Sequence, residues 1–248
     1  MEQGWLIAWV LAVVFVATLI RSSFGFGEAL VAVPLLALSM PVEIASPLAI
    51  LFSITVAVIV LLEDWHRVHF GSAWRLTLST LFGIPLGLLL LTAVPEPVVK
   101  AILAIVIIVF SIYCLVRSTP PELHSDHLAW LFGFAAGILG GAYGINGPPL
   151  VIYGTLRRWS AEQFRATLQG YFLVASTVTM AGYWWTGLWV WPVTRYYLMA
   201  LPVAILAILI GRVVNRRLAN RSFIRYIHMG LVLIGITLLI QSMIPRTN

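Results

Sequence analysis

The sequence predicts an all-α integral membrane protein built from two inverted repeats, each of about four to five transmembrane segments. Of its 248 residues, 61% are hydrophobic and only 10% are charged, whereas soluble domains are about half apolar and a quarter charged. Long apolar runs recur along the whole chain. Two of them are interrupted by spaced glycines at corresponding places in the two halves, which predicts broken or re-entrant helices.

Apolar runs of about 20 residues, the length that crosses one bilayer, define the individual segments. The N-terminal half has long runs at 4–20, 44–62, 73–93 and 97–116. The C-terminal half has long runs at 128–142, 167–187, 196–211 and 224–244. Two shorter runs, 27–40 and 147–156, directly follow the glycine breaks. Whether the short runs cross is left open, so the sequence allows eight or ten segments.

A polar link divides the single membrane domain into two repeats. The link spans 118–126, between an N-terminal repeat at 1–117 and a C-terminal repeat at 127–248. The repeats are weakly similar to each other, and Glu43 in the first corresponds to Glu162 in the second. Self-similarity of this kind indicates an internal structural repeat.

The basic residues favour ten segments, because cytoplasmic loops collect Lys and Arg. If both short runs cross, all but three of the 15 basic residues fall on one side. This count treats Arg21 as a loop residue that sets topology. It places both termini outside and makes the two five-segment halves inverted relative to each other.

Composition also excludes several functions. The net charge of +6 arises from Arg residues between apolar runs, so it indicates topology rather than nucleic acid. We find no Ser, His and Asp set and no phosphate-binding nucleotide loop, so no catalytic residue, metal or cofactor is predicted. His66 and His69 lie near acids in a short loop, but no further ligand follows at metal-site spacing.

The two glycine breaks are the strongest functional signal. They are RSSFGFGEALVAVPLL at 21–36 and GGAYGINGPPLVIY at 140–153. Glycines let a backbone leave helical geometry and approach a ligand, and the unpaired amides of the helix that resumes attract anions. We therefore predict a small-anion site between the breaks. Its candidate substrate-binding residues are Ser22, Ser23, Gly25, Gly27, Gly144, Asn146, Gly147, Pro148, Arg165 and Gln169.

Each of these candidates also has a structural interpretation. The glycines would allow close helix packing, and the serines and Asn146 would satisfy backbone groups that the breaks release. Gln169 would form an interhelical hydrogen bond. Arg165 would be a positive-inside anchor, an interpretation that we favour over a planar, bidentate contact with the anion.

Glu28 is a carboxylate inside an apolar run, which is costly and usually functional. Its reversible protonation would couple transport to protons. The alternative is an acid in the first turn of a helix, stabilised by the helix dipole. A permanent negative charge would repel an anionic substrate, which favours a protonatable Glu28.

The segments GFGEALVAVPLLAL and GGAYGINGPPLVIY resemble the paired signature of the sulfite exporter TauE/SafE family of membrane transporters. The resemblance covers nearly the whole chain. It implies a secondary transporter in the bacterial inner membrane. The implied substrates are small sulfur-bearing anions such as sulfite, sulfoacetate or related organosulfonates.

Three rival functions remain at this point. They are an anion channel, a subunit that binds a partner membrane protein, and a membrane-embedded metal-dependent enzyme that uses His66 and His69. Membrane lipids are expected partners, protons are an expected coupling ion, and small-residue helix faces allow a homodimer without requiring one.

Overall fold

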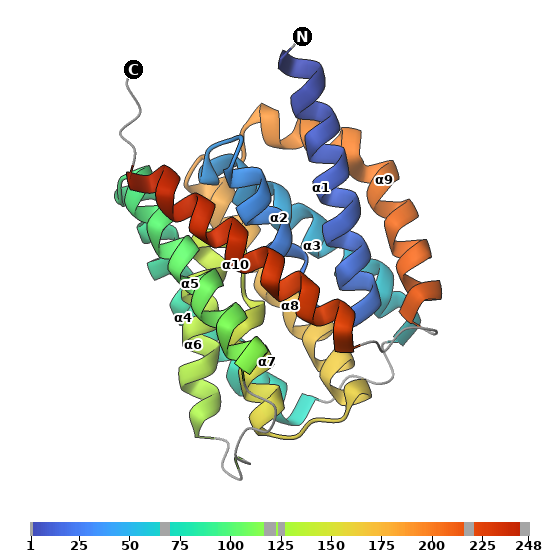
Figure 1. The fold of residues 1–248 in the computed structure, drawn as a ribbon. Coiled ribbons are helices and arrows are strands. Elements are labelled where there is room, and N and C mark those ends of the chain that lie inside the picture. The colour runs from blue at the N-terminus through green and yellow to red at the C-terminus, as the bar shows by residue number, and fades with distance from the viewer. Residues whose placement is uncertain (1, 65–69, 117–122, 124–126, 216–220, 244–248) are drawn as a thin grey trace.

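The computed structural model describes residues 2–64, 70–116, 123, 127–215 and 221–243. Within these ranges the chain forms ten helices and no strand (Figure 1). In chain order they are α1 (Glu2–Phe24), α2 (Glu28–Ala37), α3 (Val42–Asp64), α4 (Phe70–Ala93), α5 (Glu96–Val116), α6 (Leu128–Tyr143), α7 (Gly147–Leu156), α8 (Ala161–Trp185), α9 (Trp191–Asn215) and α10 (Arg221–Met243). The predicted all-helical class is confirmed.

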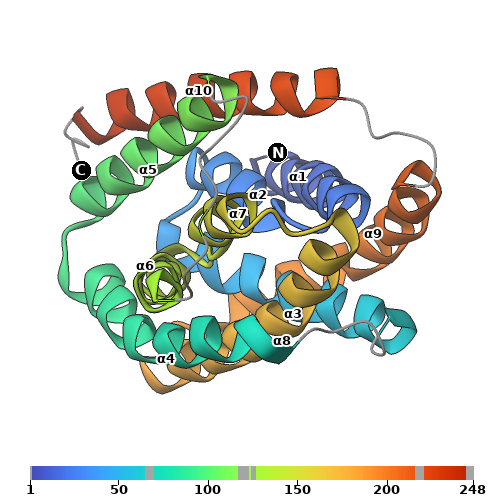
Figure 2. The ribbon, with the colours of Figure 1, turned by 90° about the horizontal axis from the view of Figure 1, so that it is seen from below.

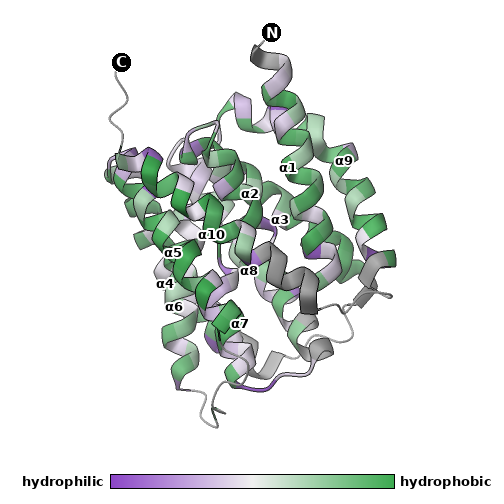
Figure 3. Cartoon of the chain, in the orientation of Figure 1, coloured by the Kyte–Doolittle hydropathy of each residue, from purple (hydrophilic) through white to green (hydrophobic). Residues whose placement is uncertain are grey.

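Five helices in the described part of the chain are long and apolar enough to cross a membrane, namely α1, α3, α4, α5 and α9. Large apolar side chains on the outer faces are exposed, among them Phe82, Leu131 and Leu233. In Figure 3, which colours the ribbon by hydropathy, green hydrophobic residues recur along all the labelled helices. An apolar exterior of this extent suits contact with lipid rather than water, so the fold is that of a multi-pass membrane protein.

Helices α2 and α7 are too short to cross a bilayer alone. Each has 10 residues, which at 1.5 Å per residue is about half the hydrocarbon thickness. Both lie near the centre of the bundle in Figure 2, with most of the longer helices around them. The two short apolar runs therefore form half-length helices, which agrees with the prediction of broken or re-entrant segments.

The helix pairing follows a shift of five helices along the chain. α1 packs along α9 and α6 packs along α4, so the shift that carries α1 to α6 also carries α4 to α9. α3 pairs with α8, and α5 pairs with α10, each its own counterpart under the same shift. This pattern agrees with two five-helix repeats. The inverted orientation of the repeats, and the division at 118–126, stay predictions, and most of that link lies outside the described residues.

Helices α4 and α6 approach until their backbones touch. A methyl group on Gly137 of α6 would lie 2.9 Å from the Cα of Gly83 of α4, and one on Gly83 would lie 2.9 Å from the nitrogen of Ile138. Only residues without a side chain allow this spacing, as in other membrane helix pairs. The seam holds α6, and with it the second glycine break, against the rest of the bundle.

Candidate functional site

Both glycine breaks turn the backbone through left-handed geometry. The φ angles are 86° at Gly25, 98° at Gly27 and 68° at Gly144. Glycine adopts such angles without the steric cost that a side chain would add. α1 and α6 therefore end at the breaks, and α2 begins directly after the first break with free N-terminal amides. α7 begins directly after the second break, where Gly147 has the free amide and Pro148 and Pro149 have no N–H.

A small cavity lies between the two breaks. Its empty space, which includes its open mouth, is about 330 Å³. The first turns of α2 and α7 both contribute to its wall, together with side chains from α1, α3 and α8. Its lining residues are Arg21, Phe26, Gly27, Glu28, Ala29, Leu30, Ser53, Gly144, Ile145, Asn146, Gly147 and Phe172. Two helix N-termini at one cavity provide a positive potential that suits an anion.

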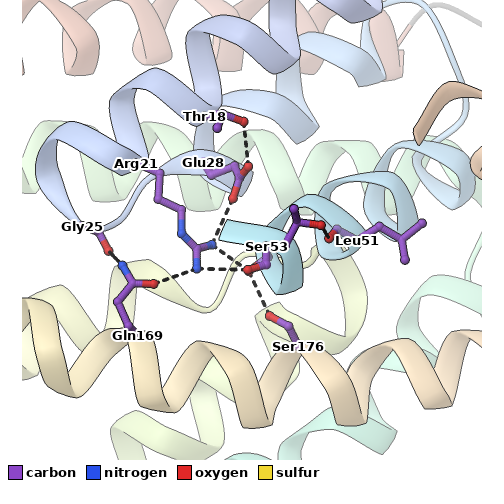
Figure 4. A network of polar contacts seen from close by, with 9 residues as sticks. Thr18, Arg21, Gly25, Glu28, Leu51, Ser53, Gln169 and Ser176 are labelled. Carbon is purple, nitrogen blue, oxygen red and sulfur yellow. Dashed lines mark hydrogen bonds and ion pairs between the residues drawn. The ribbon is translucent and has the colours of Figure 1, made fainter. Parts of the chain in front are cut away.

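The Arg21 guanidinium is the centre of a buried polar network at this cavity (Figure 4). Its Nη1 donates to Oε2 of Glu28 at 3.0 Å and to Oγ of Ser53 at 2.7 Å. Its Nη2 donates to the Ser53 carbonyl oxygen and to Oε1 of Gln169, both at 3.2 Å. Its Cζ lies 4.7 Å from the ring centroid of Phe172. A cation this deeply buried is retained only with such compensation.

The Glu28 carboxylate is held on both oxygens. Oε2 faces Arg21, while Oε1 accepts a hydrogen bond from the Thr18 hydroxyl at 2.9 Å. Only 2% of Glu28 and 3% of Arg21 is exposed, so the two charges form an ion pair inside the protein. A buried pair is stable only while both partners are present, because either charge alone would be strongly destabilising there.

Gln169 of α8 connects the C-terminal half to the first break. Its Nε2 donates to the carbonyl oxygen of Gly25 at 3.1 Å, while its Oε1 receives the hydrogen bond from Arg21. Ser176, also on α8, lies with its Oγ 3.0 Å from Oγ of Ser53. The network therefore joins α1, α2, α3 and α8.

Asn146 precedes α7 and lines the cavity from the other break. Its side chain packs against Gly140, where a methyl group would collide with the amide. Only 2% of the residue is exposed, and neither Nδ2 nor Oδ1 has a hydrogen-bond partner among the described residues. A buried amide without partners is costly, so Asn146 stays a candidate ligand of the substrate.

The sequence was compared with models of known protein families to find the family of the chain. The model of the family described as sulfite exporter TauE/SafE matches residues 10–238. The chain belongs to this family. No curated protein and no solved structure gives a significant match. TauE/SafE membership confirms the resemblance of the two glycine-break segments, and makes the chain a membrane transporter of a small molecule rather than an enzyme.

In this TauE/SafE protein, the predicted binding residues divide into two groups around the cavity. Gly27, Gly144, Asn146 and Gly147 line it directly, as does Glu28.

The remaining candidates are not among the residues that line the cavity. Gly25 and Gln169 are in contact with each other and with the network. Pro148 is buried in the first turn of α7, but it is not among the lining residues. Arg165 belongs to α8, and its side chain lies outside the described residues, so its role stays a prediction.

The two serines before the first break face α9 instead of the cavity. Ser23 Oγ donates to the Leu19 carbonyl oxygen at 2.7 Å and contacts the Gly211 carbonyl oxygen at 3.4 Å. The Cβ of Ser22 lies 2.5 Å from the position of a methyl group on Gly211. Ser23 thus takes the alternative role of a partner for backbone groups, and neither serine lines the cavity.

The interpretation of Arg21 as a topology-setting loop residue is wrong. Arg21 lies in the last turn of α1, buried and paired to Glu28. The sequence contained a usable signal, since an Arg and a Glu flank the same glycine break seven residues apart. Ser53 and Phe172 were also missed, and nothing local distinguishes them from other residues of apolar helices. His66 and His69 lie outside the described residues.

Proposed function

We propose that this TauE/SafE protein is a secondary transporter that moves a small sulfur-containing oxyanion or organosulfonate across the bacterial inner membrane. The supporting observation is the cavity between the two glycine breaks, which is lined both by Asn146, whose amide has no described partner, and by the buried Arg21. Sulfite and sulfonate groups carry negative charge on several oxygens. Such a group would accept hydrogen bonds from several directions at once.

Three kinds of donor surround the cavity. The first amides of α2 are free of intrahelical partners, and α7 adds the amide of Gly147, since the two prolines that follow it have no N–H. The Asn146 Nδ2 has no described partner, and the Arg21 guanidinium lines the cavity. Because the effective dielectric constant inside a protein is lower than that of water, each of these interactions with an anion is stronger there than in bulk solvent. The recognition is of charge and oxygen geometry, which suits oxyanions as a class.

The position of the cavity supports alternating access. Its walls come from both halves of the chain, and the Arg21 and Gln169 network bonds one half to the other. Movement of one half against the other would open the cavity to either side in turn, as in transporters with broken helices. Glu28 is the candidate proton-coupling residue, because it lines the same cavity as the proposed substrate.

Ligand-dependent thermal stabilisation of the purified protein tests the proposal. The panel is sulfite, thiosulfate, methanesulfonate, sulfoacetate, taurine, sulfate, acetate and a cationic control. A ligand that binds only the folded state raises its stability. We expect one or more sulfur oxyanions to raise the melting temperature of the wild type, and the cation to leave it unchanged.

The Asn146→Ala variant locates the site. Because the Asn146 amide has no described partner, its removal leaves the unliganded melting temperature unchanged or slightly higher, while stabilisation by the anion is lost. The protein is then reconstituted into vesicles, and uptake of the stabilising anion against its concentration gradient is measured. A channel cannot produce such accumulation. Absence of stabilisation by every anion at millimolar concentration would overturn the proposal.

A further inference from the structure

We infer that the Glu28 carboxylate and the transported anion compete for the Arg21 guanidinium, so that one monovalent oxyanion binds together with one proton. This inference rests on the proposed function and specifies how the same site is regulated. It assigns Arg21 as the residue that carries the counter-charge for the substrate, and Glu28 as the group that occupies Arg21 when the site is empty.

Arg21 is placed so that it could bind an anion in the cavity once Glu28 releases it. It is the only Lys, Arg or His among the described residues that line the cavity. One of its Nη1 hydrogens is used by Glu28 at 3.0 Å, and its Nε has no partner among the described residues. Departure of the carboxylate would therefore leave donors on two nitrogens of a cation that already borders the cavity.

The net charge of the site links anion binding to protonation of Glu28. With Glu28 ionised, the pair is neutral, and an added anion would leave a net negative charge in a buried site. Unpaired charge is strongly disfavoured at such a depth. With Glu28 protonated, Arg21 is positive and a monovalent anion restores neutrality. The site is therefore neutral in two states: empty with Glu28 ionised, and loaded with Glu28 protonated. Only in these two states does every charge have a counter-charge.

Few other groups are close enough to alter this exchange. α2 packs against α1, α3, α5 and α10. From α1, Thr18 contributes a hydroxyl, and from α3 the nearby polar side chain is Ser53. Lys100 of α5 is paired to Glu96 at 2.9 Å. His228 of α10 lines a different, apolar cavity. Arg21 is thus the only charged group in contact with Glu28 among the described residues.

The exchange makes transport of a monovalent anion electroneutral. The proton taken up by Glu28 and the anion bound to Arg21 cross together, and a pH gradient drives accumulation of the anion on the alkaline side. Binding strengthens as pH falls, because protonation of Glu28 removes the competitor. While Glu28 is mostly ionised, uptake of one proton tightens the dissociation constant about tenfold for each unit of pH.

The test is equilibrium binding of methanesulfonate to the purified full chain across mildly acidic to mildly alkaline buffers. A sulfonate stays ionised throughout this range, so any pH dependence belongs to the protein. We expect wild-type affinity to rise as pH falls. The Glu28→Gln variant, a neutral carboxyl mimic, should bind equally well at every pH, and at alkaline pH should bind at least tenfold more tightly than the wild type.

Two further variants complete the experiment. Arg21→Met alone would leave the buried Glu28 carboxylate without a positive partner and could unfold the protein. Arg21 is therefore tested in the double variant Arg21→Met with Glu28→Gln. The double variant has no buried charge at this place, so it should fold but bind no anion. The control is Thr177→Val, which removes an exposed hydroxyl of α8 that bonds only to the Leu173 carbonyl oxygen among the described residues, and it should keep the wild-type pH dependence.

The outcomes separate this inference from the proposed function. Wild-type binding that does not change with pH, pH dependence retained in Glu28→Gln, or anion binding by the double variant would overturn the competition while leaving an anion transporter. No binding of methanesulfonate by either the wild type or Glu28→Gln at any pH would overturn the competition, and the thermal panel would then decide the proposed function separately.

Discussion

The side-chain amide of Gln169 donates a hydrogen bond to the backbone carbonyl oxygen of Gly25 at 3.1 Å, although 144 residues separate them in the chain. The carbonyl belongs to the first glycine break, where α1 has ended and no helical partner is available. In a membrane such a group must find a partner inside the protein. The second half of the chain therefore completes the break in the first.

Replacement of Gln169 by Leu removes this partner. The Gly25 carbonyl oxygen and one N–H of Arg21 would both lose a hydrogen bond in a buried place, and each such loss costs about 1–3 kcal/mol. We expect a lower melting temperature and weaker anion binding. The exposed Gln241 of α10 gives the matched control, since Gln241→Leu should change neither quantity. Equal melting temperatures for the two variants would show that the bridge does not stabilise the fold.

Gly144 and Gly147 belong to the same break, but a methyl group should affect them differently. At Gly144 the φ of 68° favours glycine, and a methyl group would lie 3.0 Å from Cγ1 of Ile50. Left-handed geometry costs a residue with a side chain about 1–2 kcal/mol. Gly144→Ala should therefore destabilise the protein in a thermal melt.

At Gly147 a methyl group would meet no atom within 4 Å, and the residue lines the cavity. Gly147→Ala should keep the wild-type melting temperature while weakening anion binding, because the methyl group occupies space that the substrate needs. Wild-type affinity in Gly147→Ala would mean that the anion does not approach this backbone.

The glycine seam between α4 and α6 predicts a purely structural effect. A methyl group on Gly137 would lie 2.9 Å from the Cα of Gly83, so Gly137→Ala must push the helices apart. Overpacking of this kind costs about 1–3 kcal/mol. Gly230 of α10 has no atom within 4 Å of the same position, and Gly230→Ala should be neutral or slightly stabilising. Comparison of the two melting temperatures checks the seam.

Substitution of Thr18 provides a second test of the competition between Glu28 and the anion, because Thr18 contacts the Glu28 oxygen that does not face Arg21. Its hydroxyl donates to the ionised carboxylate at 2.9 Å, and a hydrogen bond of this kind favours the charged form. In Thr18→Val the pH midpoint of methanesulfonate binding should therefore move upward, so that at a fixed alkaline pH the variant binds more tightly than the wild type.

The control for this measurement is Thr177→Val. Thr177 is exposed on α8, and its hydroxyl bonds only to the Leu173 carbonyl oxygen at 2.7 Å among the interactions seen here. Its substitution should leave the binding curve in place. An unmoved midpoint in Thr18→Val would contradict the assigned role of Thr18.

The helices, the two breaks and the family could be predicted from the sequence because their signals are local. Apolar runs reveal helices of membrane length, and spaced glycines such as Gly25 and Gly27 mark where a helix must stop. The same signals indicated Asn146 and Gly147 as cavity residues and Glu28 as an unusual buried acid. None of these conclusions requires knowledge of which helices are neighbours.

The partners of these residues were decided by tertiary structure alone. Arg21 pairs with Glu28 and not with solvent, and its guanidinium also bonds to Ser53 of α3 and Gln169 of α8, which the chain's tertiary packing brings to it. The side that a helix end presents after a glycine break depends on the packing of distant helices. For that reason Ser22, next to Arg21 in the chain, faces α9 while Arg21 lines the cavity.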